Sequence, residues 1–390
     1  MKILFISHDA NRAGAQLFLL NIMKYLQQKG FEMHLLLLGN GSLEQAFRSI
    51  CNVQKFPTQE FNPNQSIYKK TFSKIVGNKA KNDEQKNKIL SSLQTKNFDL
   101  IYANTIATAW VLPELLNFVA APIFSHIHEL EFSIQLYSKK EDREFLFEKS
   151  SKIIACSNAV SENINTNHQV PISKIDIIHS FVDNENVLLR CLSTDNEAIK
   201  QKYNLPSSSF LIGGCGNAEW RKGIDIFIQV ANQITNSSNE NCHFVWIGVK
   251  KEGEYYEQIS YDIEKIGLKN KVTFIEPTPD AIELISCLDI FTIVSREDPF
   301  PLVMLEAALA QKTMIGFENT GGCSEFIEED AGILIPYLNT QLMAGNIIKL
   351  FKNQSFAKQL GQKAKEKVLK KYSFANSIIK IEELLKSFSV

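Results

Sequence analysis

Two carboxylates eight residues apart, Asp298 and Glu306, form the pattern in this sequence that most clearly indicates chemistry. From Leu302 to Ala310, Glu306 is the only polar residue, so a helix here would be apolar and buried on all sides. A buried carboxylate needs hydrogen-bond donors, and two neighbouring sugar hydroxyls would supply them. Asp298 precedes the helix, where free N–H groups favour an anion and can hold a phosphate. The structural alternative is that Asp298 caps the helix and Glu306 pairs with a basic core residue.

A glycine-rich loop from Gly213 to Gly223 joins an expected strand to an expected helix. Its glycines allow the backbone to approach a ligand closely, and Arg221 and Lys222 bring positive charge to the start of the helix. Cations at a helix N-terminus oppose the helix dipole, so their position favours diphosphate binding. The loop fits neither the Walker A nor the G-x-G-x-x-G motif, and an ordinary turn explains it equally well.

Gly14 and Ala15 open the first expected helix. A glycine in this place lets backbone N–H groups meet a phosphate, although a packing or capping role explains it equally well. NAD binding is disfavoured, because the G-x-G-x-x-G glycines are missing. The second expected strand also ends in Leu38-Gly39-Asn40, without the acidic residue that binds the ribose of NAD.

Two histidines, His126 and His128, share one face of an expected strand and are followed by Glu129. A metal pair is one interpretation, but the sequence shows no third ligand, and a hydrogen-bonded core histidine is commoner. No D-x-D segment occurs, which removes the usual sequence signal for a metal-dependent nucleotide-sugar site. A third interpretation places His128 and Glu129 beside a ligand as hydrogen-bonding or acid–base groups.

Strands and helices that alternate along the chain must position these residues. Expected strands cover Lys2–Ser7, Phe31–Leu38, Asp99–Ala103 and Pro122–Ile127, and the alternation restarts at Phe210. This pattern predicts two doubly wound α/β domains, 1–182 and 209–370, with a connection at 183–208 and a terminal helix at 371–390. Ligands are expected at the carboxyl ends of the strands and in the cleft between the domains.

Composition excludes several classes of protein. The 390 residues are 44% hydrophobic with a net charge of −1, which argues against a disordered chain and against a nucleic-acid binder. Seven cysteines without a C-x-x-C pair indicate reduced thiols. The first residues do not resemble a signal peptide and no apolar run is long enough to cross a bilayer, so we expect a cytoplasmic protein. The lysine-rich stretch 69–88 is most simply a solvated segment; the alternative is a patch that rests on anionic lipid.

Together these motifs resemble the GT-B glycosyltransferases of family GT4, the glycosyl transferases group 1. The segment from Ser295 to Ala310 is similar to the family's E-x7-E segment, with Asp298 in place of the first glutamate. The resemblance implies that Glu306 contacts the ribose of a nucleotide. It also implies that the donor sugar is bound by the loop before the helix, namely by Glu297, Asp298, Pro299, Phe300 and Pro301.

Lys222 resembles the lysine that binds the donor diphosphate in this family. The arginine usually found five or six residues earlier is missing, because Gly216 and Asn217 stand there, and Arg221 is the candidate to replace its charge. The resemblance implies a nucleotide contact from Gly216 and catalytic roles for His128, Glu129 and Asp298. It implies diphosphate contacts from Gly14, Ala15, Arg221, Lys222, Leu302 and Val303.

The resemblance implies a retaining, metal-independent transferase with two Rossmann-like domains that face a central cleft. Its co-substrate would be a nucleotide-diphosphate sugar, bound by residues 209–370, with no cofactor. Residues 1–182 would bind a glycan or lipid-linked acceptor in surface polysaccharide synthesis, on the inner face of the cell membrane. The terminal helix, 371–390, would cross back to the first domain. Two alternatives are a GT-B nucleotide-sugar epimerase and a non-catalytic protein that binds nucleotide sugars as the partner of a transferase.

Overall fold

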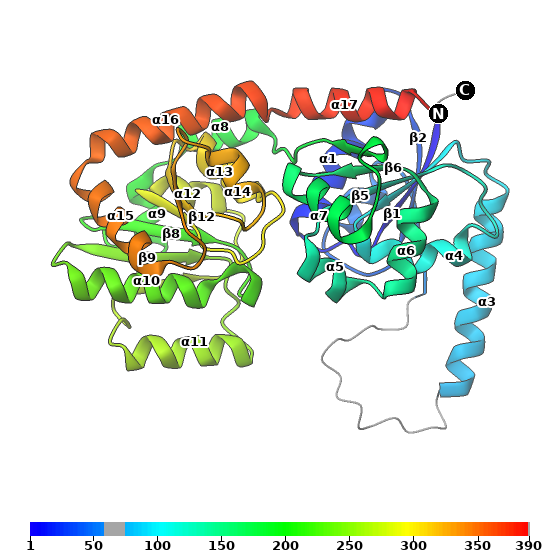
Figure 1. Ribbon diagram of the computed structural model, residues 1–390. Coiled ribbons are helices and arrows are strands. Elements are labelled where there is room, and N and C mark those ends of the chain that lie inside the picture. Colours follow the sequence, from blue (N-terminus) through cyan, green and yellow to red (C-terminus); the bar gives the residue numbers. More distant parts are fainter. Residues whose placement is uncertain (58–74, 389–390) are drawn as a thin grey trace. The chain divides into compact units, whose positions relative to one another are not determined.

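The computed structural model describes residues 1–57 and 75–388, and the side chains of all of these except residues 75–82. These residues form two units, each with a parallel sheet between layers of helices (Figure 1). Unit 1 consists of residues 1–156 and 160–178 together with the chain from Ile378 onward, and unit 2 consists of residues 157–159 and 179–377. The expected class, two doubly wound α/β domains, agrees with this architecture.

Unit 1 is built on seven parallel strands in the order β3-β2-β1-β4-β5-β6-β7. The chain runs outward from β1 to β3 and then returns to place β4 on the other side of β1. The strand order therefore reverses between β1 and β4, and such switch points are where open α/β sheets bind ligands. The strands are β1 (Lys2–Ser7), β2 (Glu32–Leu37), β3 (Asn52–Lys55), β4 (Leu100–Asn104), β5 (Ile123–Ile127), β6 (Ser150–Ala155) and β7 (Ile175–Ile177).

The helices of unit 1 include two elements that the sequence did not predict in their observed form. The apolar stretch 106–115 forms a 3-10 turn, η1, followed by the short α4, because Pro113 lies at the start of α4 and cannot donate a backbone hydrogen bond. The sequence of α3 has few apolar residues, so it lacks the apolar periodicity that would predict a helix. The helices are α1 (Gly14–Gln28), α2 (Glu44–Arg48), α3 (Ile75–Gln94), η1 (Ile106–Val111), α4 (Leu112–Leu115), α5 (Glu131–Tyr137), α6 (Lys140–Lys149), α7 (Asn158–His168) and η2 (Ile172–Lys174).

Unit 2 is built on six parallel strands in the order β10-β9-β8-β11-β12-β13. Its switch point lies between β8 and β11, so the loops that follow these two strands are the expected ligand-binding loops. The strands are β8 (Phe210–Cys215), β9 (Cys242–Ile247), β10 (Val272–Ile275), β11 (Ile290–Ile293), β12 (Thr313–Phe317) and β13 (Ile333–Ile335).

Two helical layers cover the sheet of unit 2. α10 and α15 pack against each other in one layer, and α12, α13 and α16 belong to the other (Figure 1). The helices are α8 (Asn184–Ser193), α9 (Asn196–Lys202), η3 (Trp220–Lys222), α10 (Ile224–Ser237), α11 (Glu254–Lys265), α12 (Ala281–Cys287), α13 (Leu302–Leu309), α14 (Gly322–Ile327), α15 (Thr340–Lys352) and α16 (Gln354–Lys371).

The segment 183–208, expected to connect the domains, instead contains α8 and α9 and belongs to unit 2. Both helices begin at an aspartate whose side chain accepts backbone N–H groups of the first turn. Asp183 accepts from Asn186, and Asp195 accepts from Glu197 and Ala198. These polar residues are helix caps, which explains why the segment has the composition of a linker.

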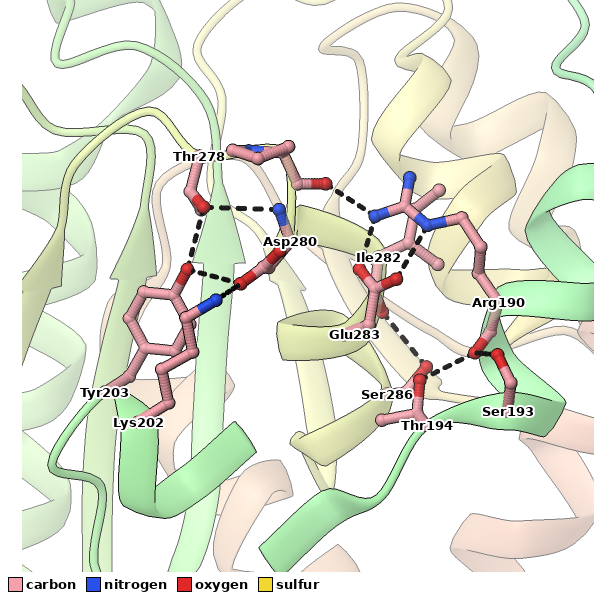
Figure 2. A network of polar contacts seen from close by, with 11 residues as sticks. Arg190, Ser193, Thr194, Lys202, Tyr203, Thr278, Asp280, Ile282, Glu283 and Ser286 are labelled. Carbon is pink, nitrogen blue, oxygen red and sulfur yellow. Dashed lines mark hydrogen bonds and ion pairs between the residues drawn. The ribbon is translucent and has the colours of Figure 1, made fainter. Parts of the chain in front are cut away.

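Ion pairs attach α8 and α9 to α12 (Figure 2). The guanidinium of Arg190 on α8 pairs with both carboxylate oxygens of Glu283 on α12, with 2.7 Å between Nε and Oε1. At the end of α9, Lys202 and the hydroxyl of the next residue, Tyr203, both donate to Asp280, the latter over 2.8 Å. These contacts make α8 and α9 part of the folded unit.

The last helix, α17 (Phe374–Lys386), carries the end of the chain into unit 1. It runs beside α1 (Figure 1), and the hydroxyl of Tyr25 on α1 donates to Glu382 over 2.5 Å. Phe388 packs edge-on against Phe124 of β5 at 4.8 Å. The apolar side chains that this helix buries are Ile378, Ile381 and Leu385.

Three further sequence features can be compared with the structure. All seven cysteines are free thiols, as predicted. No helix in the described part of the chain is long and apolar enough to cross a membrane. The lysine-rich stretch 69–88 lies mostly outside the residues whose side chains are described, so its contact with lipid stays a prediction.

Candidate active site

In unit 2 the loop after β11 holds an acidic side chain against the cations of the loop after β8. The Nζ atom of Lys222 lies 2.6 Å from Oδ2 of Asp298, and Nη1 of Arg221 lies 3.7 Å from Oδ1. The hydroxyl of Ser295 also donates to Oδ2 over 3.1 Å. The structure therefore brings together three of the predicted site residues at the switch point, with Asp298 only 5% exposed.

A second arginine fixes the position of the loop that carries Lys222. The guanidinium of Arg296 pairs with both oxygens of Asp225, at 2.9 and 2.6 Å, and donates to the carbonyl of Trp220 over 2.6 Å. It also lies over the Trp220 ring, 4.7 Å from its centre. A planar guanidinium is suited to such a bidentate and stacked arrangement, so this contact holds η3 against the end of β11.

Gly223 allows the same two loops to approach each other. Its φ is +73°, and a Cβ atom at this position would lie 2.1 Å from the carbonyl oxygen of Val294. Both facts require glycine, because other residues rarely adopt this φ and any side chain would collide with the backbone. The glycine after Lys222 is therefore explained by the contact with β11.

The predicted sugar-binding loop is also tied to the segment after β12. The N–H of Asp298 donates to the carbonyl of Thr320 over 2.7 Å, and the N–H of Gly322 donates to the carbonyl of Pro299 over 2.9 Å. The ring of Phe300 is buried and packs against Tyr372. Pro299 and Phe300 thus hold the loop in place, and their predicted contact with a donor sugar stays a prediction.

The first turn of α13 offers an anion site of the predicted kind. Pro301 precedes the helix without a side-chain cap, and no acidic residue lies in the first turn. The N–H groups of Leu302 and Val303, both half-buried, are at the positive end of the helix dipole. These features suit a phosphate, and the diphosphate contacts of Leu302 and Val303 stay a prediction.

The helix α13 is not buried on all sides, which corrects one expectation. Met304, Leu305, Ala307, Ala308 and Leu309 are buried. Glu306 is half-buried, and it shares a partly open face with residues 302, 303 and 310. This spacing is one helical face, so the carboxylate does not need to be neutralised inside the core.

Electrostatic effects place Glu306 near the end of β8. Burial raises the pKa of the Cys215 thiol to about 12, and the Glu306 carboxylate adds to the rise while Lys222 opposes it. Glu306 also helps Glu283 to raise the pKa of Arg190. The predicted nucleotide contact, Gly216, follows Cys215. The carbonyl of Gly216 accepts the indole N–H of Trp246 over 2.9 Å, so this backbone is held rigidly.

In unit 1, polar side chains follow the three neighbouring strands β1, β4 and β5, at and beside its own switch point. They are His8, Thr105 and His128. Gly14 and Ala15 begin α1, where Ala13 supplies no side-chain cap and the first turn has no acidic residue. An anion would therefore be favoured at this helix start as well.

His128 is a neutral, hydrogen-bonded side chain. Its Nε2 lies 3.0 Å from Oδ1 of Asn104, and its ring stacks on that of His126 with 4.1 Å between the centres. Burial, assisted by the nearby His8, lowers the pKa of His128 to about 3. Nδ1 of His126 lies 2.6 Å from the hydroxyl of Tyr102. In the described residues no group of three His, Cys, Asp or Glu side chains could hold a metal ion.

Glu129 is buried and binds the backbone. Its Oε2 accepts the N–H of His128 over 2.8 Å and the N–H of Ile106 over 3.3 Å. The carboxylate thus joins the end of β5 to the start of η1. This geometry suits a residue that positions His128, whereas the predicted catalytic role for Glu129 stays a prediction.

Five polar residues in these sites were not singled out from the sequence. All lie at or just beyond the end of a buried strand, or on the helix that follows it. That position, a polar residue directly after an apolar run, is the signal that could have identified most of them. They are His8, Gln16, Asn104 and Thr105 in unit 1 and Ser295 in unit 2.

Comparison with protein families agrees with this geometry. Residues 12–186 match the model described as Glycosyltransferase Family 4, and residues 195–367 match the model described as Glycosyl transferases group 1. The chain belongs to the GT4-like glycosyltransferases. The resemblance inferred from the motifs around Asp298 and Lys222 is thereby confirmed.

Curated GT4-like relatives match part of the chain. A poly(ribitol-phosphate) alpha-N-acetylglucosaminyltransferase of Staphylococcus aureus is 29% identical over 241 residues, which cover 58% of this chain and 44% of the relative. An N-acetyl-alpha-D-glucosaminyl L-malate synthase of Bacillus anthracis is 23% identical over 231 residues, which cover 58% of this chain and 57% of the relative. The chain thus spans about half the length of the curated relatives that it matches.

Solved structures show the same fold along nearly the whole chain. HepE of Anabaena, in complex with UDP and glucose, superposes with a TM-score of 0.80 at 21% identity, covering 99% of this chain and 100% of HepE. The lipopolysaccharide glycosyltransferase WaaG superposes with a TM-score of 0.74 at 14% identity, covering 98% and 99% of the two chains. These likenesses confirm the GT-B fold.

Proposed function

We propose that the protein is a retaining glycosyltransferase that moves a sugar from a nucleotide-diphosphate donor to a glycan or lipid-linked acceptor. One observation carries the proposal: Lys222 and Arg221 converge on Asp298, beside the uncapped start of α13. When the donor's sugar–phosphate bond breaks, negative charge develops on the diphosphate and must be stabilised. Two cations and a helix N-terminus are suited to that task.

The neighbouring residues support binding of the rest of the donor. Glu306 is half-buried on the open face of α13, where its carboxylate can accept the two hydroxyls of a ribose. Asp298 would accept hydroxyl groups of the sugar once the phosphate competes for Lys222. Because the leaving charge would be met by Lys222, Arg221 and backbone N–H groups, the proposed reaction needs no metal ion.

UDP-sugars are the first donors to test, since HepE was solved with UDP and glucose. Binding of UDP and hydrolysis of UDP-glucose and UDP-N-acetylglucosamine would be measured with and without EDTA. Glu306→Gln should weaken UDP binding by roughly tenfold or more, because a ribose hydrogen-bonded to a carboxylate contributes about 1.5–3 kcal/mol. Glu382→Gln, which removes another half-buried carboxylate in unit 1, is the control and should bind UDP normally.

The outcomes separate the competing functions. Release of UDP, with transfer to an acceptor and the donor's anomeric configuration preserved in the product by NMR, supports the proposal. Conversion of the donor without an acceptor indicates an epimerase, and binding without turnover indicates a non-catalytic partner protein. Failure to bind any UDP-, GDP- or other nucleotide sugar overturns the proposal.

Its proposed location is the cytoplasmic face of the membrane, and the candidate contact with anionic lipid is the lysine-rich stretch 69–88, which is otherwise a solvated segment. Sedimentation with phosphatidylglycerol vesicles, compared with phosphatidylcholine vesicles, tests this part. Equal recovery with the two lipids, or recovery unaffected by replacing these lysines with glutamine, contradicts it.

A further inference from the structure

Asn104 forms a bridge between α1 and His128 in unit 1. The side chain is buried at the end of β4, and its Nδ2 donates to the carbonyl oxygen of Ala15 over 3.2 Å. A carbonyl can only accept, so the amide nitrogen must face Ala15 and Oδ1 must face away from it. The orientation of the Asn104 amide is therefore determined by chemistry rather than by a choice between two equivalent flips.

This orientation determines the tautomer of His128. Nε2 of His128 lies 3.0 Å from Oδ1 of Asn104. Because an amide oxygen only accepts, the Nε2 atom must carry a hydrogen. A neutral imidazole has one N–H, so the lone pair must be on Nδ1. In the described residues His128 bonds through its backbone N–H, to Glu129, and through Nε2, to Asn104, and neither contact uses Nδ1.

Packing keeps the ring in this orientation. His126 stacks on one side of His128, and Phe18 meets it edge-on at 5.4 Å. A rotation of the ring by 180° would replace the Nε2–Oδ1 contact with a carbon–oxygen contact and lose the hydrogen bond. The titratable groups near the ring are His8, His126 and Glu129. The first two are histidines whose pKa is lowered by burial, and the carboxylate faces the backbone of His128.

The hydrogen-bond partners of His8 assign it the opposite tautomer. Nε2 of Gln16 donates to Asp9 and approaches Nε2 of His8 at 3.0 Å. The carboxylate of Asp9 requires the amide nitrogen on that side, so Nε2 of His8 must accept. Its Nδ1 then carries the hydrogen and donates to the hydroxyl of Thr105 over 3.0 Å. Both histidines are thus neutral, and Nδ1 of His128 offers a free lone pair.

We propose that Asn104 is a positioning residue that holds His128 as the Nε2–H tautomer, so that Nδ1 accepts a hydrogen bond from a hydroxyl group of the substrate. The choice of a sugar or acceptor hydroxyl as this donor rests on the proposed glycosyltransferase function. The tautomer itself follows from the contacts with Ala15 and His128, and it can be measured in the protein without substrate.

The tautomer can be read directly from the nitrogen spectrum. Long-range ¹H–¹⁵N correlation of the histidine rings separates the two neutral forms, and His128→Gln identifies the signals by their loss. We expect wild-type His128 to be the Nε2–H form at neutral pH. Asn104→Ala should give a mixture of tautomers, whereas Asn104→Asp should keep the Nε2–H form, because a carboxylate also accepts from Nε2.

Activity provides a second readout. Asn104→Ala should lower kcat by roughly ten- to a hundredfold, the usual effect of removing the partner of a functional histidine at metal sites, with KM for the donor little changed. Asn104→Asp should retain more activity but move the acidic limb of the pH profile upward, since the added charge favours protonated His128. Asn165→Ala is the control, because Asn165 also donates to a backbone carbonyl in unit 1, that of Val170 over 2.8 Å.

Two results would overturn the assignment of Asn104. One is wild-type His128 in the Nδ1–H or protonated form at neutral pH, and the other is an unchanged His128 spectrum in Asn104→Ala. An equal loss of kcat in Asn165→Ala would show that the loss in Asn104→Ala comes from lower protein stability and not from the position of His128. If the wild type turns over no donor, the proposed function fails, while the spectrum still decides the tautomer.

Discussion

Lys222 and Asp298 neutralise each other when no donor is bound. Their 2.6 Å ion pair is largely buried, and Arg221 lies next to it. In the proposed reaction, a diphosphate that binds Lys222 would compete with Asp298, and the Asp298 carboxylate would then be free to accept sugar hydroxyls. One ion pair can therefore couple the binding of the diphosphate to that of the sugar.

This coupling predicts opposite effects of two substitutions on the affinity for UDP. Lys222→Ala should weaken UDP binding by roughly ten- to a hundredfold, because a charged hydrogen bond contributes about 1.5–3 kcal/mol. Asp298→Asn should strengthen UDP binding, since it releases Lys222 from its partner, and should slow sugar transfer. Calorimetric titration with UDP measures both, and uridine, which has no phosphate, is the control ligand. Weaker UDP binding in Asp298→Asn would contradict the competition.

At the scale of residues, the sequence identified side chains whose type is unusual for their place. A carboxylate in an apolar helix and two cations at a helix start are each expected to lower stability unless they bind something. This expectation identified Glu306, Arg221 and Lys222 as candidate site residues. Asn104 and His8 have no such cost, because polar residues are common after strands. Asn104 bonds to Ala15, 89 residues away in the chain, and His8 bonds to Thr105, 97 residues away, so only the folded sheet brings these pairs together.

At the scale of elements, the approach of η3 to β11 depends on Gly223. Gly253 also has a positive φ, of +92°, but a Cβ atom there would meet nothing within 4 Å. Both positions therefore favour glycine because of their positive φ. Only at Gly223 would a side chain also collide with a neighbouring backbone atom. Substitution of the two glycines can therefore distinguish the effect of backbone strain from the effect of moving the loop.

Gly223→Ala should lower both stability and UDP affinity, because the loop with Arg221 and Lys222 must move away from Val294. Gly253→Ala should lower stability alone, by about 1–3 kcal/mol, because the φ of 92° and ψ of 162° at Gly253 are a conformation that residues with a side chain rarely adopt. Urea unfolding gives the first quantity and calorimetric titration with UDP the second. Normal UDP binding by a folded Gly223→Ala protein would show that the contact with β11 does not position the loop.

The elements themselves were largely predictable, because buried parallel strands are unbroken apolar runs. β3 was missed since an edge strand has a shorter and more polar pattern. The helices α8 and α9 were taken for a linker because their caps and ion pairs use the same polar residues as a loop does. Arg190 stabilises the fold by pairing with Glu283 on α12, and Asp280 by pairing with Lys202 on α9. The sequence pattern does not reveal these pairs.

At the scale of the whole molecule, the histidines with lowered pKa are concentrated in unit 1. Burial lowers the pKa of His8, His34, His126 and His128 there, and of His243 in unit 2. A histidine that binds its proton more weakly when folded makes the unfolded chain take up more protons below pH about 6.5. The free energy of unfolding must then fall as the pH falls.

Acid should therefore destabilise unit 1 more than unit 2. Between pH about 6.5 and the lowered pKa values, each such histidine removes up to about 1.4 kcal/mol per pH unit. Pulse proteolysis in urea at pH 7.5 and pH 5, with fragments assigned to the units by mass spectrometry, measures the difference. His34→Phe should reduce the pH dependence of unit 1. Equal acid sensitivity in the two units would contradict this prediction.

The return of the chain from unit 2 to unit 1 has a consequence for synthesis on the ribosome. Unit 1 begins at Met1, yet Ile381 and Leu385 fill its interior, and Ile378 lies 200 positions after Ile178 in the chain. At about 5–20 residues per second, translation needs about 10–40 s to cross that interval. The half that leaves the ribosome first is thus completed last. A nascent chain keeps apolar surface around Phe124 uncovered during this time, and chaperones would have to shield it.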